Sequence, residues 1–360
     1  MKKASIASSS NSIASARKTP RLAELDALRG VAAVLVMFFH FTTRYDQLFE
    51  HASSPLFSLP WGHYGVNLFF MISGFVIFLT LHRIQQPMDF LVSRFSRLYP
   101  AFWVAVLVTF LLTHWLELPG KTVGFATAVL NFLMFHGLFK IPSVDSVYWT
   151  LEIELLFYFW AIVVYRIGLL DRIHSALLLL FAMRLGYFVA SKFWGIEFSY
   201  TLSHLLILPY IAWFGCGIMI YRRTYLPSQS PRLDLFLLIA AWLLLAIVEG
   251  VGTGFLAMGL SVLLYFTALG RLPVLANPVL VWLGAISYTL YLLHENIGWG
   301  VILQAQRYGI EVNISIALAI VISLVMATLL SRLVERPAMR WLRDRYKQHL
   351  SRREQMGGAK

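Results

Sequence analysis

The chain has 360 residues, of which 59% are hydrophobic and only 13% are charged, and its mean hydropathy is +0.69. This composition excludes a soluble globular domain of this length. The formal net charge of +12 lies almost wholly in the two tails, so it does not indicate nucleic-acid binding, and the single cysteine, Cys216, excludes an intramolecular disulfide framework or a cysteine metal cluster.

The chain is expected to begin with a basic tail, residues 1–21, which has five basic residues, no acidic one and a Ser/Ala-rich stretch that we expect to be disordered. A membrane domain over 22–335 follows, and residues 336–360 form a second basic tail. The membrane domain contains apolar segments of a length that suits a hydrocarbon core about 30 Å thick. They lie at 27–45, 64–82, 99–117, 122–139, 148–166, 173–190, 201–221, 232–249, 254–270, 279–303 and 314–334.

Eleven crossings would put the two basic tails on opposite sides of the membrane, which the positive-inside rule opposes. The segment at 122–139 is the best candidate for one that does not cross, because it is short, follows Pro119-Gly120 and carries two polar residues. The sequence therefore predicts an all-α polytopic membrane protein with about ten transmembrane helices and both termini in the cytoplasm.

Arg29 and His40 lie eleven residues apart in the first apolar segment. Eleven steps make three helical turns plus about 20°, so both side chains point the same way, roughly 16 Å apart along the axis. Arg29 then lies at the cytoplasmic end of the span and His40 in its outer half. An ionisable residue deep in a membrane is costly, which makes His40 a functional candidate.

Three further groups carry polar chemistry. Arg94 and Arg97 are three residues apart in a cytoplasmic stretch, where guanidinium groups suit phosphate binding, although such loops are basic in any case. Glu152 and Glu154 open a long apolar helix and diverge by about 200°, so they cannot share one site. Near the end of the chain, Ser287, Tyr291 and His294 form one polar stripe at helical spacing.

Taken together, these segments resemble the acyltransferase-3 family of integral membrane acyltransferases. The matching motifs occur in family order over residues 22–340. They are Leu25-Asp26-Ala27-Leu28-Arg29-Gly30 with His40, Phe69-Phe70-x-x-Ser73-Gly74, Arg94-x-x-Arg97-Leu98-Tyr99-Pro100, Trp149-Thr150-Leu151-x-x-Glu154 with Phe157-Tyr158, Ser287-Tyr288-x-Leu290-Tyr291-x-x-His294, and Glu335-Arg336-Pro337.

The resemblance implies transfer of an acyl group, most commonly acetyl, from cytoplasmic acyl-coenzyme A to a hydroxyl of a carbohydrate on a cell-surface glycan or lipid-linked precursor. Acetyl-coenzyme A would be the co-substrate and no metal is expected. The family also implies a bacterial inner membrane. Because the chain carries no appended extracytoplasmic domain, we expect it to reach its acceptor unaided or through a separate extracytoplasmic partner.

On this reading Arg94 and Arg97, with Arg29, hold the coenzyme phosphates, and His40 acts as general base or as an acylated nucleophile. Glu154 is the first choice and Glu152 the second for a carboxylate that orients His40. Trp149, Ser287, Tyr291 and His294 are the candidate substrate-binding residues. The alternative is a transporter or flippase for a glycolipid or small polar solute, in which the same embedded side chains line a permeation path.

Overall fold

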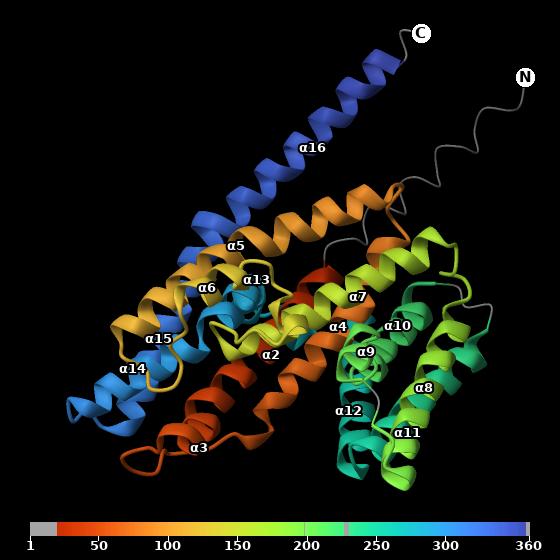
Figure 1. Cartoon of the computed structure of the whole chain (residues 1–360). Helices are drawn as coiled ribbons and strands as arrows, with labels where there is room; N and C mark the ends of the chain where they lie inside the picture. Colours follow the sequence, from red (N-terminus) through yellow and green to blue (C-terminus); the bar gives the residue numbers. More distant parts are fainter. Residues whose placement is uncertain (1–19, 198, 227–229, 358–360) are drawn as a thin grey trace, which may run out of the picture.

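The structure, a computed structural model, describes residues 20–357 except residue 198 and residues 227–229. In this part of the chain all regular structure is helical and no strand occurs (Figure 1). The predicted all-α polytopic class is therefore confirmed. The predicted disordered tail, residues 1–21, lies almost entirely outside the described residues.

The described residues contain eight helical segments that are long and apolar enough to cross a membrane. They are Ala23–Phe49, Pro60–Leu81, Pro87–Trp115, Ser146–Arg166, Ile173–Trp194, Pro231–Val248, Val251–Ala268 and Val312–Arg352. Two further stretches, α10 (Ile211–Tyr225) and the consecutive helices α13 (Pro278–Leu293) and α14 (Glu295–Arg307), are the remaining predicted spans. A total of ten crossings stays a prediction.

The helices that build these segments are labelled in Figure 1. They are α2 (Pro20–Phe39), η1 (His40–Arg44), α3 (Tyr45–Phe49), η2 (Pro60–Tyr64), α4 (Gly65–Leu81), α5 (Pro87–Trp115), α6 (Phe125–Asn131), η3 (His136–Phe139), η4 (Ser146–Tyr148), α7 (Trp149–Arg166), α8 (Ile173–Trp194), α9 (Tyr200–Leu205), α11 (Pro231–Val248), α12 (Val251–Ala268), η5 (Pro273–Ala276), α15 (Val312–Leu330), η6 (Ser331–Glu335) and α16 (Arg336–Gly357).

Three predicted segments are not single helices. Segment 122–139 contains only α6 and η3, and the seven residues of α6 rise about 10 Å, too little to cross a bilayer. This agrees with the prediction that the segment does not cross. Segment 201–221 divides into α9 and α10, and segment 279–303 is interrupted at His294, between α13 and α14.

Small residues let the central helices approach closely. A Cβ atom at Gly30 of α2 would lie 2.5 Å from the backbone nitrogen of Gly284 in α13. A Cβ at Gly217 of α10 would lie 1.8 Å from the carbonyl oxygen of Met71 in α4. Close backbone packing through small residues is typical of helices in membranes. These contacts hold α2 against α13 and α10 against α4.

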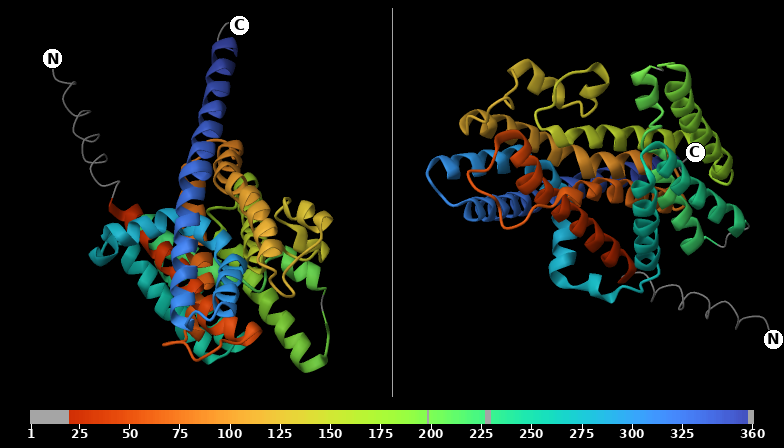
Figure 2. Two further views of the ribbon diagram at one scale, coloured as in Figure 1. Left: turned by 90° about the vertical axis from the view of Figure 1, so that its left-hand side faces the viewer. Right: turned by 90° about the horizontal axis from the view of Figure 1, so that it is seen from below.

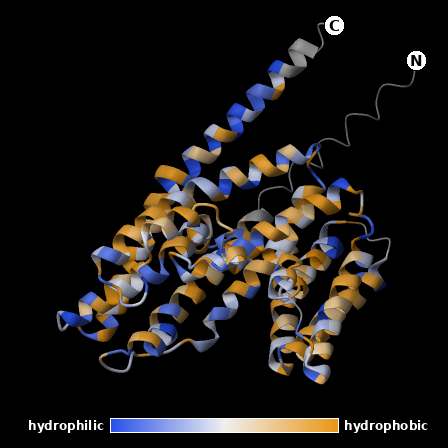
Figure 3. Ribbon diagram, viewed as in Figure 1, coloured by the Kyte–Doolittle hydropathy of each residue, from blue (hydrophilic) through white to orange (hydrophobic). Residues whose placement is uncertain are grey.

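The connecting segments gather at two ends of the bundle. At one end, the backbone nitrogen of Ala52 donates to Gln306, and the Gln304 side chain donates to the Leu116 carbonyl. At the opposite end, Tyr346 of α16 donates to Asp89 at the start of α5. Helix α16 runs alongside α5 and extends past it (Figure 2). Hydrophilic residues mark the outer part of α16, whereas hydrophobic residues dominate the helices of the bundle (Figure 3).

Candidate functional site: two adjoining cavities

His40 and His294 both lie where a helix departs from regular α geometry. His40 begins η1, a π-helical segment in the continuous helical stretch from α2 to α3. His294 lies at the interruption between α13 and α14. Such departures free backbone groups and recur at functional sites. Here the His40 carbonyl accepts a hydrogen bond from the Trp299 indole at 2.8 Å, which ties the π-helical segment to α14.

The hydrogen bonds around these two rings define their tautomers. Nδ1 of His294 lies 3.1 and 3.0 Å from the carbonyl oxygens of Leu290 and Tyr291, so it carries the hydrogen. Nε2 of a neutral His294 is then an acceptor, and it lies 2.9 Å from Nδ1 of His40. His40 therefore carries its hydrogen on Nδ1, where the Val36 carbonyl is a second acceptor. Its Nε2 keeps a free lone pair.

A glutamate that follows His294 directly faces this lone pair. Glu295 Oε1 lies 3.6 Å from His40 Nε2, and Glu295 is almost fully buried. The Ser146 hydroxyl donates to the same oxygen at 2.6 Å. The residues next to this pair are also hydrogen-bonded, because the backbone nitrogen of Asn296 donates to the Asp145 side chain at 3.2 Å. The segment before α7 is thus held against the start of α14.

Asp145 and Glu295 form a buried pair of carboxyl groups. Asp145 is fully buried, and the Glu295 carboxyl group lies close enough for its charge to act on it. Burial, followed by the nearby charge of Glu295, raises the pKa of Asp145 well above its ordinary value.

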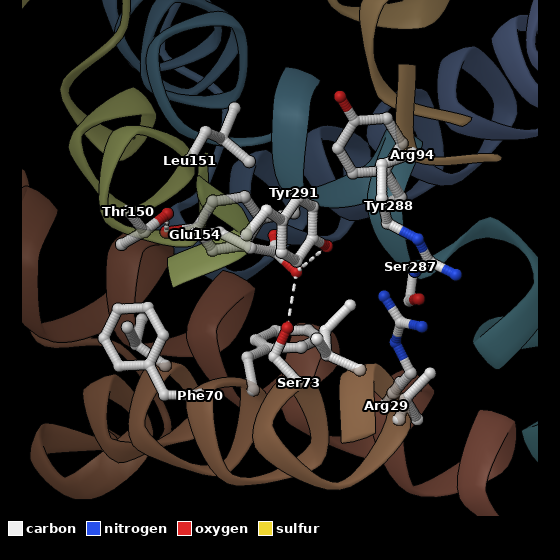
Figure 4. Close-up of a pocket in the computed structure, with 15 residues that line it drawn as sticks. Arg29, Phe70, Ser73, Arg94, Thr150, Leu151, Glu154, Ser287, Tyr288 and Tyr291 are labelled. Carbon is white, nitrogen blue, oxygen red and sulfur yellow. Dashed lines mark hydrogen bonds between the residues drawn. The ribbon is translucent and has the colours of Figure 1, made fainter. Parts of the chain in front are cut away.

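A second polar group lies nearer the N-terminal end of α2. Arg29 and Arg94 extend toward one another beside Ser287 (Figure 4). Among the described residues no acceptor contacts the buried Nε atom of either arginine. Glu154 lines the same cavity and accepts hydrogen bonds from Ser73 at 2.6 Å and from Tyr158 at 2.5 Å. We call this space the arginine cavity.

The space around His40 is larger, and we call it the histidine cavity. It has a volume of about 370 Å³, against about 50 Å³ for the arginine cavity. His40, Glu295 and Trp149 line it. Three side chains, Val66, Phe70 and Tyr291, line both cavities and form the partition between them. The Tyr291 hydroxyl is fixed by Thr150 at 2.9 Å and by the Val147 carbonyl at 3.3 Å.

The structure distributes the predicted site residues between these two spaces. Arg29, Arg94 and Ser287 line the arginine cavity, and Tyr291 lies in the partition. His40 and Trp149 line the histidine cavity, and His294, which is not part of the lining, is hydrogen-bonded to His40. Arg97 is not part of either lining, although it is close enough to interact electrostatically with Arg29.

The predicted partner of His40 requires a correction. Glu154 lies in the arginine cavity with Ser73 and Tyr158, and the carboxylate that faces His40 is Glu295. Glu152 is farther removed, because its carboxylate packs against Gly137 and accepts backbone hydrogen bonds from Gly137 and Leu138. The two glutamates do diverge as their spacing predicts. An ionisable residue directly after His294 was the signal that could have identified Glu295.

No group of three or more His, Cys, Asp or Glu side chains in the described ranges is arranged to hold a metal ion. The functional groups of the site are instead an imidazole with a free lone pair, a buried carboxylate beside it, and two arginines in the adjoining cavity. An all-helical membrane bundle that holds a base and two arginines in adjoining cavities is suited to transferring a group between two substrates.

Comparison with known proteins identifies that group. Residues 22–335 match the acyltransferase-3 family model, described as an acyltransferase domain, and the chain therefore belongs to this family of membrane acyltransferases. It is an enzyme that transfers an acyl group between a donor and an acceptor at a bilayer.

The chain is also similar to two individual proteins. The chain is 25% identical over 293 residues to the acetyltransferase candidate ORF330 of Acidianus two-tailed virus, covering 76% of this chain and 82% of the relative. It is 31% identical over 156 residues to Nodulation protein 10 of Rhizobium leguminosarum bv. viciae, covering 37% of this chain and 41% of the relative. No solved structure matches the chain significantly.

Proposed function

We propose that this enzyme moves an acetyl group from cytoplasmic acetyl-coenzyme A to a hydroxyl of a carbohydrate at the opposite membrane face. The observation that carries the proposal is the shared partition: Val66, Phe70 and Tyr291 line both the space of two arginines and the space of His40. The basic tails support a cytoplasmic location for the arginine end of α2. A bacterial inner membrane is the proposed location.

The arginine end would bind the donor. Arg29 and Arg94 offer guanidinium hydrogens to an anion, and their buried Nε atoms have no acceptor among the described residues. Arg97 adds positive charge close to Arg29. A cavity of about 50 Å³ is too small for a nucleotide, so the phosphates would lie at its mouth. The slender pantetheine arm would then reach through the partition, which must open to admit it.

His40 would act as the general base. Its Nε2 takes the proton of the acceptor hydroxyl while the hydroxyl oxygen attacks the thioester carbonyl carbon. The carbon–sulfur bond breaks, and the departing thiolate takes the proton from His40, which leaves an ester and free coenzyme A. General base catalysis of this kind contributes about 10² to 10⁴ in rate. In the alternative route the acetyl group passes first to Nε2 and then to the acceptor.

The residues around His40 would support this cycle. His294 keeps the hydrogen on Nδ1 of His40 and so leaves Nε2 unprotonated before the reaction. Glu295, 3.6 Å away, supplies a negative charge opposite the imidazolium that forms. This is the role that the sequence predicted for Glu154. Trp149 and Tyr210, whose rings lie 5.4 Å apart beside His40, offer aromatic faces to a sugar.

The test follows radiolabelled acetyl-coenzyme A with the purified protein in lipid nanodiscs. We expect wild-type turnover, a loss of about 10² or more in His40→Ala, and an increased KM for the donor in Arg94→Gln. His114→Ala is the matched control, because His114 is exposed and bonds only within its own helix.

Label that remains on the wild-type protein but not on His40→Ala would indicate the acyl-enzyme route. Turnover without retained label would indicate direct transfer or hydrolysis. If the folded wild-type protein neither binds acetyl-coenzyme A nor turns it over, the proposed donor is wrong.

A further inference from the structure

The lining of the histidine cavity carries more positive charge than the proposed chemistry at His40 requires. Besides His40, the cavity is lined by Arg44, from the last position of η1, and by His63, from η2. Lys121, above the Trp299 ring at 4.9 Å, is close enough for its charge to act on His40. Arg44 and His63 therefore line this cavity beside His40, and the charge of Lys121 acts on it from nearby.

Arg44 has no anionic partner in the described part of the chain. Its guanidinium donates to the neutral Gln47 side chain at 3.0 Å. The nearest acidic residue along the chain, Asp46, instead accepts the backbone nitrogen of His51 at 3.1 Å. The described residues place no carboxylate oxygen within ion-pair distance of Arg44. An exposed arginine that lines a cavity and lacks such a partner is available to a ligand.

The acidic side chain in the lining does not offset this charge. Glu295 is the one carboxylate among the described residues that line the cavity, and the Ser146 hydroxyl already donates to it. Its Oε1 atom lies 3.6 Å from His40 Nε2, and it is not within ion-pair distance of Arg44. The lining around Arg44 thus has a positive field that attracts anions and concentrates them near His40.

Two aromatic rings lie beside Arg44 in this cavity. Trp149 is 42% exposed, and its ring lies 5.4 Å from that of Tyr210. Both rings line the same cavity as His40 and Arg44. A pyranose ring has an apolar face that an aromatic ring can cover, while its substituents extend outward to polar groups. A cavity of about 370 Å³ has room for one such sugar unit.

We propose that the acceptor is an anionic glycoside, whose sugar ring stacks on Trp149 and whose carboxylate or phosphate group pairs with Arg44. This inference rests on the proposed function, because it names the acceptor class of the same site. The anionic substituent would hold the sugar so that a neighbouring hydroxyl faces Nε2 of His40. Neutral glycosides would lack this attachment and bind weakly.

The experiment compares three probes that differ only at C6: octyl β-D-glucoside, octyl β-D-glucuronide and octyl β-D-glucoside 6-phosphate. Equilibrium binding to the full-length protein in nanodiscs is measured in 50 mM and in 500 mM KCl. We expect Kd for at least one anionic probe to be about tenfold lower than for the neutral probe, as a charge-assisted hydrogen bond would give. High salt should reduce the difference.

Arg44→Gln should remove the preference for the anionic probe, whereas Arg307→Gln should preserve it. Arg307 is the matched control because it is exposed at the same end of the bundle but does not line the cavity. The two anionic probes separate a carboxylate from a phosphate as the recognised group.

Equal binding of all three probes, absence of binding, or a preference that survives in Arg44→Gln would overturn the proposal. These results differ from failure of the proposed function, which is read separately as acetyl-coenzyme A turnover that does not depend on His40.

Discussion

The hydrogen bond between His40 and His294 leads to a quantitative prediction. Replacing His294 with phenylalanine keeps a flat ring in a fully buried position but removes the acceptor that lies 2.9 Å from Nδ1 of His40. The hydrogen of His40 then has only the Val36 carbonyl as a protein acceptor, and the other tautomer becomes accessible. In that tautomer Nε2 carries the hydrogen and cannot take a proton from an acceptor.

The size of the effect follows from the cost of leaving a buried polar group without its partner, which is about 1–3 kcal/mol. Because about 1.4 kcal/mol corresponds to a factor of ten, kcat should fall by about 5- to 140-fold. The KM for acetyl-coenzyme A should stay near the wild-type value, since His294 does not line the arginine cavity. His294→Gln, which restores an acceptor oxygen, should recover part of kcat.

The assay combines steady-state kinetics with ¹⁵N NMR of histidine-labelled protein. The chain has ten histidines, so the His40 signals are assigned from their loss in His40→Gln. We expect nitrogen shifts typical of the Nδ1–H tautomer in the wild type and a mixture in His294→Phe. Thermal unfolding provides the check that the variant is folded. A folded His294→Phe protein with wild-type kcat would refute the proposed role of His294.

Three further predictions concern charge, packing and pH. Glu295→Gln should lower kcat by about 10- to 100-fold because the imidazolium loses its counter-charge. Glu152 faces Gly137, so the kcat of Glu152→Gln should stay within about twofold of the wild-type value, and equal losses of kcat in the two variants would contradict this prediction. Gly217→Ala should lower the free energy of unfolding by about 1–3 kcal/mol or more, because the added Cβ would meet the Met71 carbonyl. Gly186 has open space around it, so Gly186→Ala should leave the free energy of unfolding unchanged, and denaturation of both variants in detergent compares the two. Burial lowers the pKa of His136, which lies outside the predicted spans, to about 4. Between about pH 6.5 and pH 4 the unfolded chain therefore binds a proton at this residue that the folded protein does not, so stability should fall as the pH drops through this range. His136→Gln should have a flatter dependence of Tm on pH, and an unchanged slope would exclude His136 as its source.

Much of the helical organisation could be predicted from the sequence, because the length and hydropathy of a membrane span are local properties. The interruption at His294 could not, since residues 279–303 read as one apolar segment and hydropathy does not reveal a break in the hydrogen-bond pattern. The same holds for the π-helical segment at His40–Arg44, which depends on contacts such as the Trp299 bond to the His40 carbonyl.

The sequence identified many of the residues that line the two cavities, but not which of them contact one another. The sequence indicates that Glu152 and Glu154 diverge, but it does not indicate which carboxylate meets His40. That depends on how the segment around Ser146 packs against the start of α14, a contact between residues 149 positions apart. Helical spacing places residues around one axis. It carries no information on which face of another helix lies opposite.

The partition between the two cavities has a consequence for the cell. An enzyme that handled a donor at one membrane face and an acceptor at the other through an open, polar passage would let ions and protons cross. Val66 and Phe70 are apolar, and the hydroxyl of Tyr291 is tied to Thr150 and Val147. Together they interrupt the line of polar groups between Arg29 and His40. The membrane could therefore keep its electrochemical gradient while the resting enzyme waits for substrate.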